Sequence, residues 1–164
     1  MSRAFSRLVR AGWPRAAAFS LLLAVLAPTA FADIVVTEAW SRATVPGVTT
    51  GVGYLVLTNN GDEKRSLLRI TSPVCDTVML HLSSVDSQGV ARMWPIGQLE
   101  LEPGQSIRFE PTGRHVMFMG ISTPFKVGTK VPLVLQFDGG EKPVTVMLEV
   151  RPITAAASSE PRKQ

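Results

Sequence analysis

Short apolar segments separated by turn-forming residues recur along the chain after position 33, and they restrict it to one class of fold. Each segment spans four to seven residues and ends at a cluster of Gly, Pro, Asn, Asp or Ser, as strands and tight turns do. No segment after residue 32 keeps the 3.6-residue period of an amphipathic helix. The pattern predicts an all-β sandwich or barrel with Greek-key connections. The expected strands are Ile34–Trp40, Val52–Thr58, Ser66–Ile70, Thr77–Leu82, Val90–Trp94, Gln98–Leu101, Ser106–Phe109, His115–Met119, Val131–Phe137 and Val144–Val150.

The first 32 residues have the three-part order of a secretory signal peptide. Four arginines in the first fifteen positions precede the apolar segment Ala16–Ala27, and small residues flank Phe31 just before Asp33. The segment has 12 residues, whereas a membrane span needs about 20, so an uncleaved anchor is the weaker interpretation. No cysteine follows this segment directly, so no lipid attachment is expected there. We expect cleavage after Ala32, a mature periplasmic protein that starts at Asp33, and no membrane span after cleavage.

The remaining chain is expected to form one domain at residues 33–153, followed by a disordered polar tail at residues 154–164. Beyond residue 32 there are 13 basic and 13 acidic residues, so the basic pI comes from the leader and no nucleic-acid partner is expected. A single cysteine, Cys75, excludes an internal disulfide and a cysteine-rich metal site. The sequence has no P-loop, dinucleotide glycine motif or recognisable nucleophile–base pattern, so we do not expect an enzyme.

Histidine and methionine form the chemically distinctive pattern of the chain. The only two histidines are His81 and His115, and Met93 and Met117 accompany them. Because residues i and i+2 of a strand face the same side, His115 and Met117 share the face opposite the apolar one. A hairpin around the turn at residues 86–89 would bring Met93 close to His81. A methionine in a strand is usually a core filler, so only the four residues together indicate a site.

The residue types of this group select a metal ion. Soft thioether sulfur combined with imidazole suits Cu(I). Zinc prefers thiolate, imidazole or carboxylate, and calcium and magnesium prefer oxygen. A ligand set without thiolate stays neutral and would hold Cu(I) firmly but exchangeably. The sequence therefore predicts a Cu(I) site at His81, Met93, His115 and Met117, provided that their strands are neighbours.

The spacing of these residues, H-x11-M-x21-H-x-M, resembles the signature of the periplasmic copper chaperones called PCuAC. The resemblance extends over about Ile34 to Val150. Supporting marks are Ala39-Trp40 with Arg42, Gly51–Thr58, Asn59 with Gly61, Ser72-Pro73-Val74, Pro103-Gly104 and His115–Gly120. The resemblance implies a cupredoxin-like Greek-key β-sandwich that binds one Cu(I) per chain through His81, Met93, His115 and Met117. It also implies copper supply to the copper A centre of cytochrome c oxidase, with a Sco-like protein or cytochrome c oxidase subunit II as partner. We expect a monomer.

The chain departs from the family pattern in several places. Leu82 follows the first histidine where the family often has methionine, and Met79 stands where an acidic residue is common. Met79 is therefore either an auxiliary soft ligand or part of a hydrophobic rim. Cys75 lies too far along the strand to be a ligand. Trp40 and Trp94 are expected to pack in the core.

Two other functions compete with copper carriage. A cupredoxin-like electron carrier needs a cysteine thiolate and two histidines in one site, but Cys75 is far from both histidines in the sequence. A metal-free β-sandwich interaction module would take up no Cu(I). Copper carriage is the leading hypothesis because it alone uses all four residues of the pattern.

Overall fold

The computed structural model describes residues 34–139 and 142–154. The expectations for the signal peptide at residues 1–32 and for the tail beyond residue 154 lie outside this part. A strand forms at each of the ten expected segments. The strands are β1 (Ile34–Arg42), β2 (Thr50–Asn59), β3 (Arg65–Thr71), β4 (Thr77–Val85), β5 (Ala91–Pro95), β6 (Leu99–Leu101), β7 (Ser106–Arg108), β8 (Arg114–Met119), β9 (Lys130–Phe137) and β10 (Val144–Arg151).

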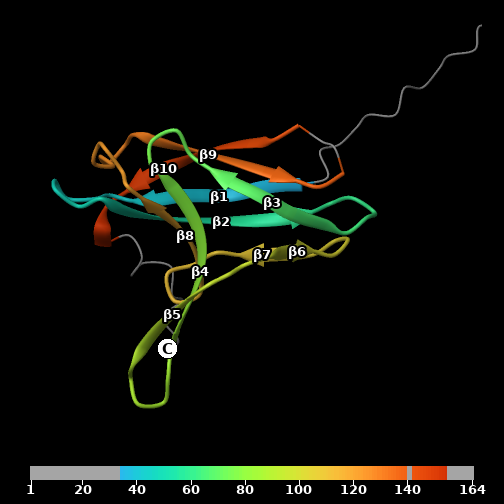
Figure 1. Ribbon diagram of the computed structural model, residues 1–164, viewed down its shortest axis with the longest axis horizontal. Coiled ribbons are helices and arrows are strands. Elements are labelled where there is room, and N and C mark those ends of the chain that lie inside the picture. The colour runs from blue at the N-terminus through green and yellow to red at the C-terminus, as the bar shows by residue number, and fades with distance from the viewer. Residues whose placement is uncertain (1–33, 140–141, 155–164) are drawn as a thin grey trace, which may run out of the picture. The chain divides into compact units, whose positions relative to one another are not determined.

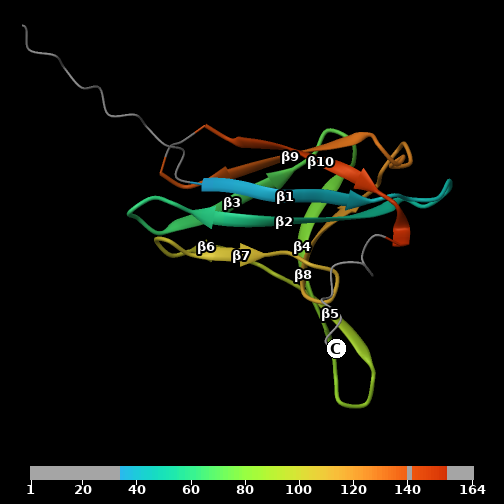
Figure 2. The ribbon, with the colours of Figure 1, turned by 180° about the vertical axis from the view of Figure 1, so that it is seen from behind.

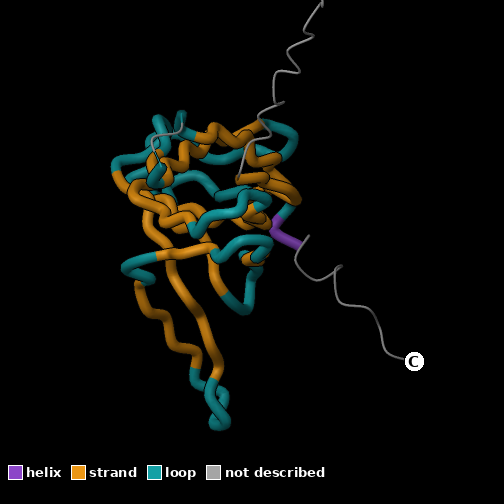
Figure 3. The backbone as a smooth tube through the Cα atoms, turned by 90° about the vertical axis from the view of Figure 1, so that its right-hand side faces the viewer, coloured by secondary structure: helices purple, strands orange, loops and turns teal. Residues whose placement is uncertain are grey.

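The all-β prediction is confirmed. Within the described ranges, the only helical residues belong to a 3₁₀ turn at 153–154 (Figure 3). None of the described residues belongs to a helix long and apolar enough to cross a membrane.

The strands form one hydrogen-bonded sheet that curls around the core. Their order is β5-β4-β8-β2-β1-β10-β9-β3-β6. The first part of β2 pairs with β8, and the later part of β2 pairs with β7. β1 and β10 are parallel, and the other pairs are antiparallel. The curl brings β3 and β4 near each other although they are distant in the strand order (Figure 1). Crossovers place β8 between β4 and β2, which puts the two histidine-bearing strands side by side.

The two faces of β4 and β8 have different environments because side chains alternate along a strand. Val78 and Leu80 of β4 and Val116 and Phe118 of β8 are buried in the hydrophobic core. Burying a side chain of this size stabilises the fold by about 1.5–3 kcal/mol. This burial fixes the register of both strands, so the intervening residues must occupy the opposite face.

Asn59 organises the turn after β2 and holds the sheet closed. Its side chain is fully buried, and Nδ2 donates hydrogen bonds to the carbonyl oxygens of Glu63 at 2.7 Å and Leu101 at 3.1 Å. Oδ1 accepts a hydrogen bond from the Gly61 amide at 3.0 Å. An unpaired buried polar group costs about 1–3 kcal/mol, so this position requires an amide side chain. The bond to Leu101 ties β6 to the end of β2.

A β-bulge in β1 changes the face on which Trp40 lies. Glu38 has a φ of 51°, and the pairing with β2 shifts register between Thr37 and Trp40. Strict alternation from Ile34 would direct Trp40 into the core. After the bulge, Trp40 instead packs on the outer face, with its ring centroid 4.5 Å from that of Tyr54. The expectation of a core position for Trp40 is therefore wrong.

β4 and β5 form a hairpin that projects from the rest of the sheet (Figures 1 and 2). The Asp86 side chain organises its turn by accepting hydrogen bonds from the amides of Gln88 and Val90. Trp94 lies opposite Leu82 and is 45% exposed, so the expected core position of Trp94 is also wrong. The physical reason is that the hairpin extends past the strands that enclose the core.

Candidate metal centre

The two histidines lie directly opposite each other on neighbouring antiparallel strands. His81 of β4 pairs with His115 of β8. Their ring centroids are 5.8 Å apart, and the ring planes are inclined by 56°. Residues directly opposite in such a pair have Cβ atoms about 4.5–5.5 Å apart, so the contact follows from the register. The structure therefore brings together the two imidazoles that the sequence predicts as ligands.

Met117 lies on the same face as His115, two residues further along β8. The rise between such residues is about 6.6–6.8 Å. Met117 is half-buried, and it pairs directly with Met79 of β4, which is also half-buried. This pairing was not assigned from the sequence, because strand neighbours far apart in the sequence are set by the whole fold. The mirrored spacing, Met-x-His in β4 and His-x-Met in β8, is the signal for it in the sequence.

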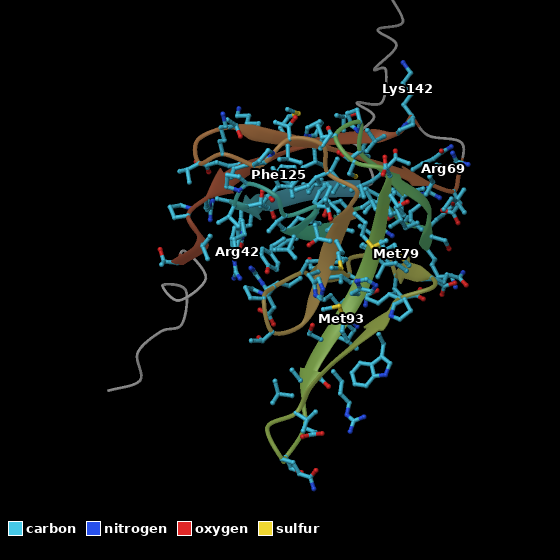
Figure 4. All side chains as sticks on the ribbon, turned by 60° about the vertical axis from the view of Figure 1, so that its left-hand side comes forward. Arg42, Arg69, Met79, Met93, Phe125 and Lys142 are labelled. Atoms are coloured by element: carbon cyan, nitrogen blue, oxygen red, sulfur yellow. The ribbon has the colours of Figure 1, made fainter. Side chains whose placement is uncertain are left out.

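Met93 reaches the site from the projecting hairpin. It pairs with Ser83, which shares the face of His81, so Met93 is a diagonal neighbour of His81 across β4 and β5. Its side chain is 51% exposed. Figure 4 shows Met79 closer to the body of the sheet and Met93 near the base of the hairpin. The expected hairpin is present, and it leaves Met93 the most accessible of the four predicted ligands.

The surroundings of His81 favour the neutral imidazole that binds metals, and a backbone contact orients the ring of His115. His115 is only 4% exposed, and its Nδ1 lies 3.2 Å from the carbonyl oxygen of Gly113. A carbonyl only accepts, so this contact selects the tautomer with the proton on Nδ1 and leaves the Nε2 lone pair free. Burial lowers the pKa of His81 below its usual 6.5, and the neighbouring His115 lowers the pKa further.

An unpaired nitrogen at His81 supports a ligand role for the site. Among the described residues, the Nδ1 atom of His81 is a buried side-chain nitrogen atom without a hydrogen-bond partner. A buried imidazole normally finds a partner, so such an atom needs an explanation. A soft metal ion between two imidazoles and nearby thioethers provides one, and the donor types fit Cu(I).

Cys75 lies away from this group. It precedes β4, packs against the hydrophobic core, and its Sγ donates a weak hydrogen bond to the Thr77 carbonyl oxygen at 3.4 Å. Burial raises the pKa of the Cys75 thiol above its usual 9.0. In the described part of the chain, no three His, Cys, Asp or Glu side chains group together to hold a metal ion. Copper ligation at this face would therefore combine the two imidazoles with thioethers.

Comparison with solved structures defines the class of protein. The apo PCuAC domain of PmoF2 is 23% identical, with a TM-score of 0.62, and the match covers 76% of this chain and 94% of that one. The copper-bound PCuAC domain of PmoF2 has the same identity and a TM-score of 0.61, covering 74% and 94%. The solution structure of CuI-DR1885 from Deinococcus radiodurans is 27% identical, with a TM-score of 0.57, covering 76% and 81%. The chain has the cupredoxin-like β fold of PCuAC domains, as expected.

Sequence comparison then gives the family. The LpqE-like family, described as lipoproteins, matches residues 34–150. The protein Lxx21020 of Leifsonia xyli subsp. xyli (strain CTCB07), also named as a lipoprotein, is 29% identical over 113 residues. That match covers 68% of this chain and 66% of the Leifsonia protein, slightly less than two thirds of its length. The chain belongs to the LpqE-like family. Together with the structural matches to PCuAC domains, this confirms the resemblance to the PCuAC family.

Proposed function

We propose that this protein is an exported Cu(I) carrier that binds one ion through His81, Met93, His115 and Met117. The observation that carries the proposal is the direct pairing of His81 with His115, with thioethers on both sides of the imidazole pair. The copper-bound PmoF2 domain and the CuI-DR1885 structure, which share this fold, support it.

The chemistry of the donors explains why such a site would carry copper without trapping it. Thioether sulfur and neutral imidazole add no charge, so the ion is held by soft donation alone. An acceptor that offers a thiolate binds the same ion with an added electrostatic attraction. Exposure of Met93 gives an incoming ligand access to one side of the site. Copper would therefore pass to the acceptor by ligand exchange.

The destination of the copper follows from the family resemblance. We expect delivery in the periplasm towards the copper A centre of cytochrome c oxidase, through a Sco-like protein or directly to subunit II. The proposal involves no catalysis, because the ion enters and leaves without any change in covalent bonds. An electron-carrier function lacks support, because the Cys75 sulfur packs against the core and offers no thiolate to the histidines.

The test is a titration of the purified protein with Cu(I) under reducing conditions, against a competing chelator. We expect one equivalent, and the His115→Ala and Met117→Ala variants should bind at least about 100-fold more weakly. Met147→Leu is the matched control because Met147 is exposed on β10, which is not a neighbour of β4 or β8. Thermal unfolding of each metal-free variant separates lost ligation from lost folding. Unchanged affinity in both alanine variants would refute the proposal.

A further inference from the structure

Met79 occupies on β4 the position that Met117 occupies on β8. The strands are antiparallel, and their pairs are Met79 with Met117 and His81 with His115. Directly opposite residues of an antiparallel pair lie at the same level along the strands and on the same face of the sheet. Met79 is therefore one same-face step from His81, as Met117 is one same-face step from His115. Met79 and the predicted ligand Met117 thus lie side by side next to the imidazole pair.

The dimensions of this four-residue group suit a single ion. Opposite Cβ atoms across the two strands are about 4.5–5.5 Å apart, and successive residues on one face are about 6.6–6.8 Å apart. A methionine side chain has three rotatable bonds, so its sulfur can adapt to a centre between the four residues. The geometry allows Met79, His81, His115 and Met117 to converge without any contribution from the hairpin.

Packing does not explain Met79 as a core residue. Its sequence neighbours Val78 and Leu80 are 8% and 7% exposed and belong to the core, so Met79 faces the other side of β4. Met79 also borders, with Val78 and Leu80, a hollow of about 300 Å³ between β3 and β4. The face on which Met79 lies is that of a ligand to an ion beside the two imidazoles.

Resting on the proposed function, we infer that Met79 is a fifth soft ligand and that the copper cargo has two alternative ligand sets. The retention set is Met79, His81, His115 and Met117, all in the body of the sheet. The transfer set replaces Met79 with Met93, whose half-exposed thioether lies on the projecting hairpin. Met79 would keep the ion bound while Met93 gives way to the sulfur of an acceptor.

The test uses protein in which the methionine ε-methyl groups carry ¹³C. The described part of the chain contains five methionines, Met79, Met93, Met117, Met119 and Met147. Single Met→Leu variants, which nearly conserve volume, assign each methyl resonance. One equivalent of Cu(I) should shift the resonances of Met79, Met93 and Met117. The resonance of Met147, exposed on β10, should remain unchanged.

Affinity and release rate give a second readout. We expect Met79→Leu and Met93→Leu each to weaken Cu(I) binding by about 10-fold. The double variant should weaken it by more than about 100-fold, which is the product of the two single effects, because each thioether substitutes for the other. Met79→Leu should speed the loss of Cu(I) to a chelator, whereas Met147→Leu should not. The inference is overturned if Cu(I) shifts the methyl resonances of Met93 and Met117 but leaves the methyl resonance of Met79 unchanged. A protein that binds no Cu(I) at all refutes the proposed function, and the inference with it.

Discussion

Replacing Gly53 with alanine would add a methyl group where the core has no room. Gly53 lies in β2 opposite Val116 of β8. A Cβ at this position would lie 2.6 Å from Cδ2 of Leu148 and 3.1 Å from Cε2 of Phe118. Both side chains are fully buried, so neither can turn into solvent to relieve the overlap. Leu148 of β10 must therefore repack within the core, or the backbone of β2 must shift.

Two opposing terms set the size of the effect on stability. Overpacking a well-packed core costs about 1–3 kcal/mol, and the 2.6 Å approach to Leu148 favours the upper half of that range. Alanine also restricts the unfolded chain, which offsets about 0.4–1 kcal/mol. The net loss for Gly53→Ala is about 1–2.5 kcal/mol. In a domain of this size, that loss lowers the Tm by roughly 3–12 °C.

Urea and thermal unfolding of the metal-free protein measure this loss directly. Gly97→Ala is the matched control, because a Cβ at Gly97 meets no heavy atom within 4 Å. We expect Gly97→Ala to stay within about 0.5 kcal/mol of the wild type, as surface substitutions usually do. If Gly53→Ala unfolds at the same urea concentration and temperature as Gly97→Ala, the account of the packing of β2 against Phe118 and Leu148 is wrong.

Four further predictions concern acid, the tail and export. The pKa of His81 is lower in the folded protein than in the unfolded chain, so as the pH falls below about 6.5 the unfolded chain binds a proton at His81 more readily. The metal-free protein should therefore lose stability below that pH, and His81→Ala should lose less stability over the same pH range. Cu(I) affinity should decline below about pH 6 with at most two protons taken up, as chelator competition at several pH values would show, because only the imidazoles compete with protons. Removal of residues 154–164, which contain no His, Met or Cys, should leave one Cu(I) equivalent, and a lost equivalent would contradict this. Mass spectrometry of the exported protein should give a chain that starts at Asp33, and an intact Met1 would refute cleavage.

The strands were predictable from the sequence because each one depends on local alternation and local turn chemistry. Asn59 and Gly61 mark the turn after β2 in the sequence, and the structure uses both in its hydrogen bonds. The bulge at Glu38 was not predictable, since the sequence around it continues to read as one strand. Its register shift places Trp40 beside Tyr54 on the outer face. The alternation of side chains along a strand predicts the face of each residue only where the pairing with the neighbouring strand has no bulge.

The site was predictable in its residue types and less so in its arrangement. The period of two correctly assigned His115 and Met117 to one face, and the turn near Asp86 correctly indicated the hairpin that carries Met93. That β8 lies against β4 is a long-range pairing, which depends on the whole core and on no local signal. The role of Met79 stayed open in the sequence for this reason, since its partner in β8 is 38 positions away.

The parallel pairing of β1 with β10 determines where other molecules can be attached without obstructing the histidine face. Ile34 pairs with Asn59 at one end of β2, whereas Trp40 lies six residues further along, beside the end of β2 that pairs with β8. Six residues of strand span about 20 Å. A tether or fused domain joined ahead of Ile34 is thus attached far from the imidazoles. One joined after Arg151, where β10 ends beside Arg42 of β1, begins at the same end of the sheet as the pairing of β2 with β8. An N-terminal affinity tag therefore suits binding measurements better than a C-terminal one.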